Sequence, residues 1–140
     1  MVSKTVDPIF FTATAEGVSN GRTTTGIMPF KTVKEQLGGG FDPDGTFVAP
    51  QPGIYYFSFT MMKYNDGHST NSYTYADLYH NNLHLCRGYD NDGHNYHHMF
   101  GCSATVNMKN GDRVYVKLQR GKIHTGIYCT FSGVRILPMN

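Results

Sequence analysis

The sequence predicts an all-β protein, a ten-stranded antiparallel jelly-roll sandwich, on three observations. Short segments rich in Val, Ile, Thr, Tyr and Phe recur along the 140 residues, and clusters of Gly, Asn, Asp and Pro separate them. Several segments alternate apolar and polar residues with the two-residue period of a strand. No segment shows the 3.6-residue apolar period of a helix over three turns, so essentially no helix is expected. Eight to ten short strands at this spacing are typical of a sandwich or jelly roll.

The rest of the chain is organised around residues 41–59, FDPDGTFVAPQPGIYYFSF. A turn-rich lead-in and a short strand over 46–49 precede a Pro-Gln-Pro-Gly corner and a long strand. Alternation gives one face of that strand Tyr55, Phe57 and Phe59, and the other face Ile54, Tyr56 and Ser58. A sheet of an antiparallel sandwich buries one face in its own domain. The second apolar face therefore needs another partner, most simply another copy of the chain.

The first half of the chain contains fewer clear strands. Residues 9–15, IFFTATA, predict the first strand because they are β-branched and aromatic. A polar turn with three glycines follows over 16–26. Residues 27–33 are extended, and Pro29 favours an edge position, since proline cannot donate to a strand ladder. Residues 34–40 end in three glycines and are expected to form a flexible turn.

The second half contains the strongest hairpin signals. Strands over 73–80 and 83–89 flank an Asn-Asn turn, and strands over 97–108 and 112–120 flank the turn Asn110-Gly111. The last strand is expected over 127–137. Residues 64–72 and 90–95 consist mainly of turn formers, which predicts two loops.

Three cysteines, Cys86, Cys102 and Cys129, cannot all pair within one chain. Two arrangements are compatible with the sequence: one disulfide bridge plus one free thiol, or three buried thiols. The spacing matches neither a zinc knuckle nor a CxxC redox pair. The cysteines alone therefore leave the compartment open.

Charge and composition exclude several classes of protein. Charged residues make up 16% of a chain that has ten Tyr and nine Phe. A net charge of +2 and scattered basic residues give no stripe for nucleic acid. No apolar run reaches the ~18 residues that span a bilayer, so membrane insertion is not expected. The N-terminus lacks the apolar core of a signal peptide, so in a secreted protein the leader would have been removed or replaced.

Enzyme activity is not expected. A catalytic set could be assembled from Asp92, His94, His97 and His98, but His97 and His98 are adjacent in a predicted strand and point to opposite faces. Residues 17–21 fit the letters of a Gly-x-Ser-x-Gly elbow. That motif needs a following helix, whereas a Thr-rich turn follows here.

The two predicted loops share the tetrapeptide Asn-Asp-Gly-His, at 65–68 and 91–94, and each lies beside tyrosines. Planar polar side chains bond pairs of sugar hydroxyls, and aromatic rings cover the apolar side of a sugar. The alternative is that the tetrapeptide simply forms a turn, since Asn, Asp and Gly are common turn residues. The carbohydrate hypothesis assigns the ligand-binding residues as Tyr64, Asp66, His68, Tyr89, Asn91, Asp92, His94 and Tyr96.

These features together resemble the C1q globular-head domain family, within the wider TNF-like jelly-roll superfamily. The resemblance covers Phe11 to Leu137 and is carried by Phe30, Phe41, Phe47, Gly53, Tyr55, Phe57, Phe59, Gly111, Asp112, Val114, Phe131, Ser132 and Gly133. Gln36 departs from it, because the family favours Asn or Asp there. No Gly-X-Y repeat is present, so the chain resembles the stand-alone form found in molluscs and other invertebrates, with an extension over 1–8 and the domain over 9–140.

The resemblance implies a secreted homotrimer with Ile54, Tyr56, Met99 and Gly101 near the threefold axis. It also implies a lectin of innate immunity that binds sialic acid or other microbial surface glycans. The alternative is a signalling ligand or extracellular scaffold that binds a protein receptor. Calcium is expected at Asp90 and Asp92, because some family members carry it in this loop. Zinc is less suited, since the His pairs 80/84 and 94/98 would converge on a metal only on a helix.

Overall fold

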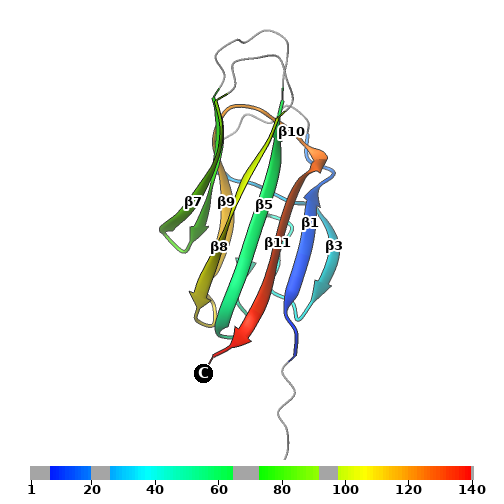
Figure 1. Ribbon diagram of the computed structural model, residues 1–140. Coiled ribbons are helices and arrows are strands. Elements are labelled where there is room, and N and C mark those ends of the chain that lie inside the picture. The colour runs from blue at the N-terminus through cyan, green and yellow to red at the C-terminus, as the bar shows by residue number, and fades with distance from the viewer. Residues whose placement is uncertain (1–6, 20–25, 65–72, 92–97, 140) are drawn as a thin grey trace, which may run out of the picture.

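The computed structural model describes residues 7–19, 26–64, 73–91 and 98–139, which form two antiparallel β-sheets packed face to face (Figure 1). The described residues contain no helix, and hence none that could cross a membrane. The predicted jelly-roll-like sandwich is therefore confirmed. The strands are β1 (Phe10–Ala15), β2 (Gly26–Ile27), β3 (Thr32–Leu37), β4 (Phe47–Val48), β5 (Gly53–Lys63), β6 (Thr74–His80), β7 (Leu83–Asp90), β8 (Met99–Met108), β9 (Arg113–Arg120), β10 (Ile123–His124) and β11 (Gly126–Pro138).

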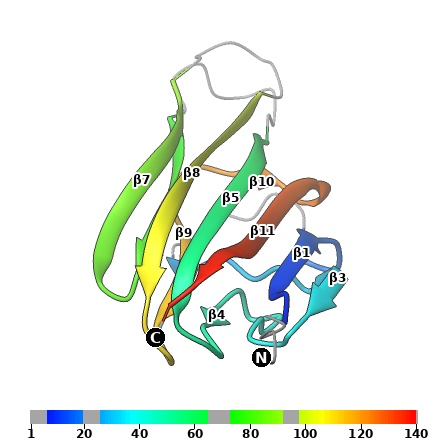
Figure 2. The ribbon, with the colours of Figure 1, turned by 60° about the horizontal axis from the view of Figure 1, so that its bottom comes forward.

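The two layers have distinct strand orders. Sheet A runs β8, β5, β11, β1 and β3, and β10 pairs with the end of β5. Sheet B runs β7, β6, β9 and β2, with β4 also paired to β9. Figure 2 shows β5, β11 and β1 side by side in one layer, with β9 behind them. The long strand predicted from the sequence, β5, thus lies inside sheet A, between β8 and β11.

An aromatic core fills the space between the sheets. The ring of Phe11 in sheet A lies 4.4 Å from the ring of Phe41, 5.3 Å from that of Phe47 and 5.0 Å from that of Phe131, measured between centroids. Phe47 belongs to sheet B, so these contacts join the two layers. Parallel-displaced and edge-on ring pairs at such distances are the geometries that aromatic side chains favour.

The alternation predicted for β5 is confirmed. Tyr55, Phe57 and Phe59 are at most 1% exposed, whereas Tyr56 is 40% exposed on the opposite face. The buried Tyr55 hydroxyl donates a hydrogen bond to the Gln51 carbonyl oxygen at 2.8 Å, so its polar atom is satisfied. The long strand therefore contributes one face to the core and presents a second apolar face outward.

A disulfide joins Cys86 of β7 to Cys102 of β8, with a Cα–Cα distance of 6.2 Å, so one bridge with one free thiol is the arrangement present. The bridge ties the edge of sheet B to the edge of sheet A, where the two backbones approach closely. A Cβ atom on Gly88 would lie 2.7 Å from the Cα of Gly101. Cys129 is buried, and burial raises the pKa of its thiol to about 11.

The structure corrects two elements. The segment 27–33 is predicted to be extended throughout, whereas β3 begins at Thr32. Residues 34–37 are predicted to be part of a turn, but they belong to strand β3, which pairs with β1. This pairing overrides the local turn signal, and Gln36 accepts a hydrogen bond from the Phe41 backbone N–H at 3.1 Å. In addition, β10 forms inside a predicted turn because it pairs with the end of β5. The described residues therefore form eleven strands rather than ten.

One charged side chain, Asp77 of β6, is completely buried on the outer side of sheet B. Arg87 donates two hydrogen bonds to its carboxylate, at 2.6 and 2.9 Å, and Gln119 donates a third at 3.2 Å. Desolvation raises the pKa of Asp77, but the hydrogen bonds from Arg87 and His84 outweigh it and hold the pKa below its ordinary value. The carboxylate is thus ionised and serves as the anchor of a polar network.

Replacing Gly133 by Ala should destabilise the fold by about 1–3 kcal/mol, through overpacking. A Cβ atom there would lie 2.6 Å from the Phe57 ring and 2.7 Å from the Phe11 ring. Denaturant unfolding of the variant measures the loss. Ser132→Ala, one residue earlier on the outward face, is the control and should change stability by less than about 0.5 kcal/mol. Equal stability of Gly133→Ala and the wild type would contradict the packing.

Asp77→Asn should lower the free energy of unfolding by about 2 kcal/mol at pH 7, because the amide cannot accept two bonds from Arg87 as an anion. The folded-state pKa is depressed, so this stability is present above the unfolded pKa of about 3.9 and is lost as the pH falls through the folded pKa. Thermal unfolding from pH 7 to pH 2 should therefore show that the melting temperatures of the wild type and Asp77→Asn converge in acid. A constant difference across that range would argue against an ionised Asp77.

Candidate functional site

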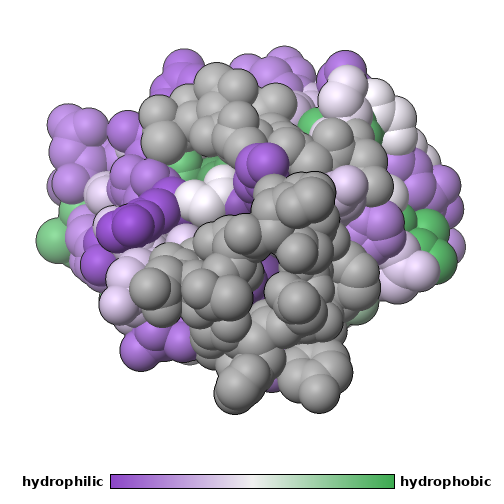
Figure 3. Space-filling model, turned by 90° about the horizontal axis from the view of Figure 1, so that it is seen from above, coloured by the Kyte–Doolittle hydropathy of each residue, from purple (hydrophilic) through white to green (hydrophobic). Residues whose placement is uncertain are grey.

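The ends of four strands meet at one end of the sandwich, shown at the top of Figure 1. There β5 ends next to the start of β8, through the pair Met62 and Met99, and β6 begins next to the end of β7, through the pair Thr74 and Asp90. The segments predicted to be ligand loops therefore leave the sandwich from the same end. Figure 3 looks down on this end and shows mostly hydrophilic residues around the atoms drawn in grey.

A first aromatic cluster at this end belongs to sheet B. The rings of Tyr73 and Tyr89 stack at 6.3 Å, and the ring of Tyr75 lies 6.0 Å from that of Tyr89. Tyr89 is 51% exposed and Tyr73 is 37% exposed, so ring surface is available to a ligand. The guanidinium of Arg120 lies 5.0 Å from the centre of the Tyr73 ring. The cluster combines ring faces with a cation.

A second cluster belongs to sheet A and contains Tyr64. Its ring lies 5.9 Å from the His124 ring, which in turn stacks on Tyr128 at 4.7 Å. The predicted tyrosines Tyr64 and Tyr89 are therefore divided between two clusters on different sheets. Sequence reasoning missed His124, Tyr128 and Arg120, because these residues reach the end of the sandwich on strands that are remote along the chain.

Several predicted ligand residues lie outside the part of the chain that the structure describes. They are Asp66, His68, Asp92, His94 and Tyr96. The described Asn91 is exposed and directly follows β7, next to the Tyr89 cluster. Of the eight predicted ligand residues, the structure thus describes Tyr64, Tyr89 and Asn91.

Of the two predicted calcium ligands, the described residues include Asp90. Its side chain is mostly buried, and its Oδ2 atom lies 3.8 Å from Nδ1 of His98. Within residues 7–19, 26–64, 73–91 and 98–139, no three His, Cys, Asp or Glu side chains are grouped as metal ligands. His80 and His84 lie against different carboxylates, those of Asp112 and Asp77. A calcium ion at Asp90 would therefore need ligands from beyond these residues.

The predicted trimer residues share the outer face of sheet A. Ile54 and Tyr56 lie on β5, and Met99 and Gly101 lie on the adjacent β8. Met99 is 50% exposed. Packing within the sheet also requires glycine at position 101, because a Cβ atom there would collide with the Phe59 carbonyl oxygen.

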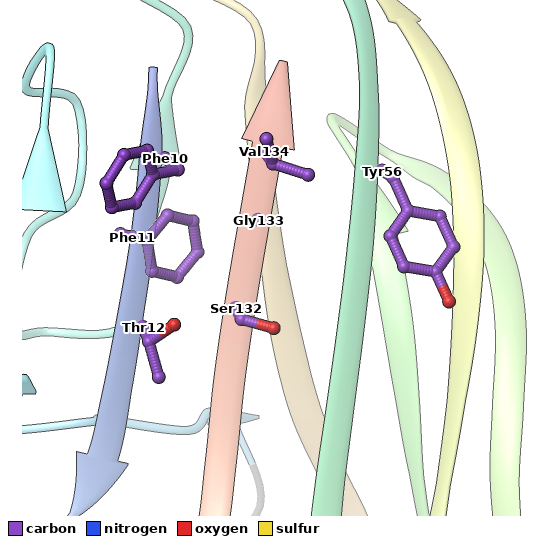
Figure 4. Close-up of a pocket in the computed structure, with 7 residues that line it drawn as sticks. All are labelled: Phe10, Phe11, Thr12, Tyr56, Ser132, Gly133 and Val134. Atoms are coloured by element: carbon purple, nitrogen blue, oxygen red, sulfur yellow. The ribbon is translucent and has the colours of Figure 1, made fainter. Parts of the chain in front are cut away.

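A shallow hollow of about 300 Å³ marks the same face (Figure 4). Phe10 of β1 lies at one side of it, Val134 and Ser132 of β11 lie in the middle, and Tyr56 of β5 lies at the other side. Val134 is 39% exposed, although it is apolar. An outer sheet face with exposed aromatic and aliphatic side chains around a hollow is suited to contact with another protein surface.

Comparison with known proteins agrees with this architecture. The C1q domain family matches residues 10–136. The globular domain of the zebrafish complement 1qA protein superposes with a TM-score of 0.74 at 17% identity, covering 94% of this chain and 98% of that chain. Murine APRIL superposes with a TM-score of 0.66 at 11% identity, covering 93% and 98%. Eiger TNF from S. frugiperda superposes with a TM-score of 0.63 at 11% identity, covering 95% and 94%. The chain therefore belongs to the C1q domain family.

Proposed function

We propose that this protein is a secreted C1q-domain lectin that recognises carbohydrates on microbial surfaces, at the end of the sandwich that carries the Tyr89 cluster. The observation that carries the proposal is the half-exposed ring of Tyr89, stacked with Tyr73 directly before the polar loop that begins at Asn91. A ring face covers the apolar side of a sugar, and planar polar groups bond its hydroxyls. The C1q and TNF-like families include lectin-like and ligand-like members.

The outer face of sheet A supports the trimeric part of the proposal. Domains of this family form trimers, and here Tyr56, Val134 and Met99 expose apolar surface on one sheet face. Three copies arranged around an axis would bury that surface in a closed ring. Three identical sites on one particle would then raise a weak single-site affinity by avidity, because a second binding event becomes intramolecular.

We further propose that the protein binds its ligand without catalysing a reaction and that it is located outside the cell. Domains of this family are typically extracellular, and the disulfide between Cys86 and Cys102 is of the kind that persists in oxidising compartments. Calcium at Asp90 and Asp92 is proposed as a further part of the end site, where it would help to hold the loop or contact sugar hydroxyls directly.

Sedimentation equilibrium at micromolar concentration should give three times the chain mass of 15.7 kDa. Tyr56→Glu should shift the protein towards single chains, because it places a charge within the apolar face. Leu83→Glu is the matched control: Leu83 is 62% exposed on the β6–β7 hairpin, away from sheet A, and its replacement should leave the trimer intact. A wild-type mass of one chain would rule out the trimer.

Glycan-array binding with and without chelator tests the carbohydrate site. Tyr89→Ala, Asp92→Ala and Tyr96→Ala should each weaken binding by about tenfold without dissociating the trimer, since each removes one sugar contact. Leu83→Ala, at the opposite end of β7 from Tyr89, is the control and should bind as the wild type does.

The array results separate the parts of this proposal. An array on which the trimer binds nothing would exclude the lectin and favour the receptor-binding alternative. Binding that chelator leaves unchanged would exclude a role for calcium. Loss of the trimer in Asp92→Ala or Tyr96→Ala would assign those residues a structural role instead.

A further inference from the structure

The outer face of sheet B carries a set of basic and aromatic side chains, most of which lie outside the proposed end site; two of them, Tyr75 and Arg120, also contact the Tyr89 cluster. We call it the basic-aromatic face and define it by Tyr75, Tyr79, Arg87, Tyr115, Lys117 and Arg120, which lie on β6, β7 and β9. Strand register places Arg87 and Lys117 on either side of Asp77, on the two strands that flank β6. Tyr79 lies opposite Tyr115 in the same way.

Ring contacts hold the cations of this face in place. The guanidinium of Arg87 lies 4.2 Å from the centre of the Tyr75 ring, and the ammonium of Lys117 lies 5.6 Å from that of Tyr79. Tyr79 and Tyr115 stack at 5.6 Å with an interplanar angle of 12°. Long basic side chains normally lose rotamer freedom when they bind an anion. Here that cost is reduced, because the rings already restrict the cations.

The charge that this face presents to solvent is positive. Among the described residues of β6, β7 and β9, the carboxylates are those of Asp77 and Asp90, and both are buried. Arg87 covers Asp77 and keeps 46% of its own side chain exposed. Because the pair of Arg87 and Asp77 carries no net charge, the surplus comes from Lys117 and Arg120 on β9. An overall charge of +2 for the whole chain therefore conceals a local surplus of positive charge.

We propose that the basic-aromatic face binds an anionic polysaccharide through its sulfate or carboxylate groups. Neighbouring strands lie about 4.8 Å apart, so Arg87 and Lys117 on the two flanking strands present cations at roughly twice that spacing. A polymer that repeats its anionic groups along a flexible chain can meet several such cations at once. The tyrosine hydroxyls and ring edges between the cations suit the hydroxyls and C–H groups of the sugar rings.

The arrangement favours a polysaccharide over a single-stranded nucleic acid. Nucleic acid binding of that kind depends on ring faces on which bases stack. In this face Tyr75 and Tyr79 each carry a cation against the ring, and Tyr79 also stacks on Tyr115. The basic-aromatic face is built from strands rather than from the predicted ligand loops. It shares Tyr75 and Arg120 with the Tyr89 cluster, so Lys117, which lies outside that cluster, is the residue that tests it separately from the end site.

Surface plasmon resonance on immobilised dextran sulfate tests the proposal, with unsulfated dextran as the matched neutral polymer. The wild type should bind dextran sulfate and not dextran. The double variant Lys117→Gln/Arg120→Gln should bind about tenfold more weakly, because it removes two cations and leaves the pair of Asp77 and Arg87 intact. The dependence of log affinity on log salt concentration should become shallower by about two, one for each lost ion contact.

The matched control is Lys31→Gln/Lys109→Gln, which removes the same total charge from exposed positions outside β6, β7 and β9. It should change dextran sulfate binding by less than about twofold, because charge away from the contact acts only through the screened long-range field. An equal loss in both double variants would overturn the proposal, since binding would then depend on net charge alone. Lys117→Arg should retain binding, and its failure to do so would also count against an ion contact.

Two further arms separate this inference from its competitors. Poly-L-glutamate or oligo(dT) that binds as tightly as dextran sulfate, with the same sensitivity to Lys117→Gln/Arg120→Gln, would overturn the polysaccharide assignment. Tyr89→Ala should retain dextran sulfate binding even where it loses glycan-array binding, and Lys117→Gln, which lies outside the Tyr89 cluster, should do the reverse. This pair of variants distinguishes failure of the end site from failure of this face. Thermal unfolding of each variant confirms that the fold is retained, and the single variant Lys117→Gln replaces the double variant if Arg120→Gln is unstable.

Discussion

The contact between Phe11 of sheet A and Phe47 of sheet B is the interaction on which the rest of the structure depends. Each aromatic ring buries about 150–250 Å² of apolar surface, which corresponds to several kcal/mol of hydrophobic stabilisation for the ring set as a whole. The rings fit only because Gly133 leaves room beside Phe11 and Phe57. Once this core fixes which residues point inward, strand alternation determines which residues point outward.

The two outward faces differ in chemistry because their strands carry different residues at alternate positions. Sheet A presents Tyr56, Val134 and Met99, which are apolar and suited to contact with another copy. Sheet B presents cations that are held against tyrosine rings, which suit a polar or anionic ligand. The end of the sandwich that carries the Tyr89 cluster adds a third surface. The proposed self-association and the proposed ligand recognition would therefore use separate surfaces of one small domain.

Asp77 links the stability of the fold to the chemistry of sheet B. A buried carboxylate is costly to desolvate, and Arg87 and Gln119 compensate by donating hydrogen bonds to it. The same contacts hold Arg87 beside Tyr75. A charge that would otherwise destabilise the sheet thus positions a surface cation. The disulfide between Cys86 and Cys102 holds the neighbouring edge of sheet B close to sheet A.

The sequence by itself determined what depends on near neighbours in the chain: the strand alternation of β5, the hairpin turns, the absence of helical periodicity and the resemblance to the C1q domain. It also placed Tyr64 and Tyr89 at strand ends. Only the tertiary structure decided the pairing of Cys86 with Cys102, the strand β3 in place of a turn, and the separation of the tyrosines into two clusters. Each of these depends on which remote strands lie side by side, and local residue preferences carry no information about that choice.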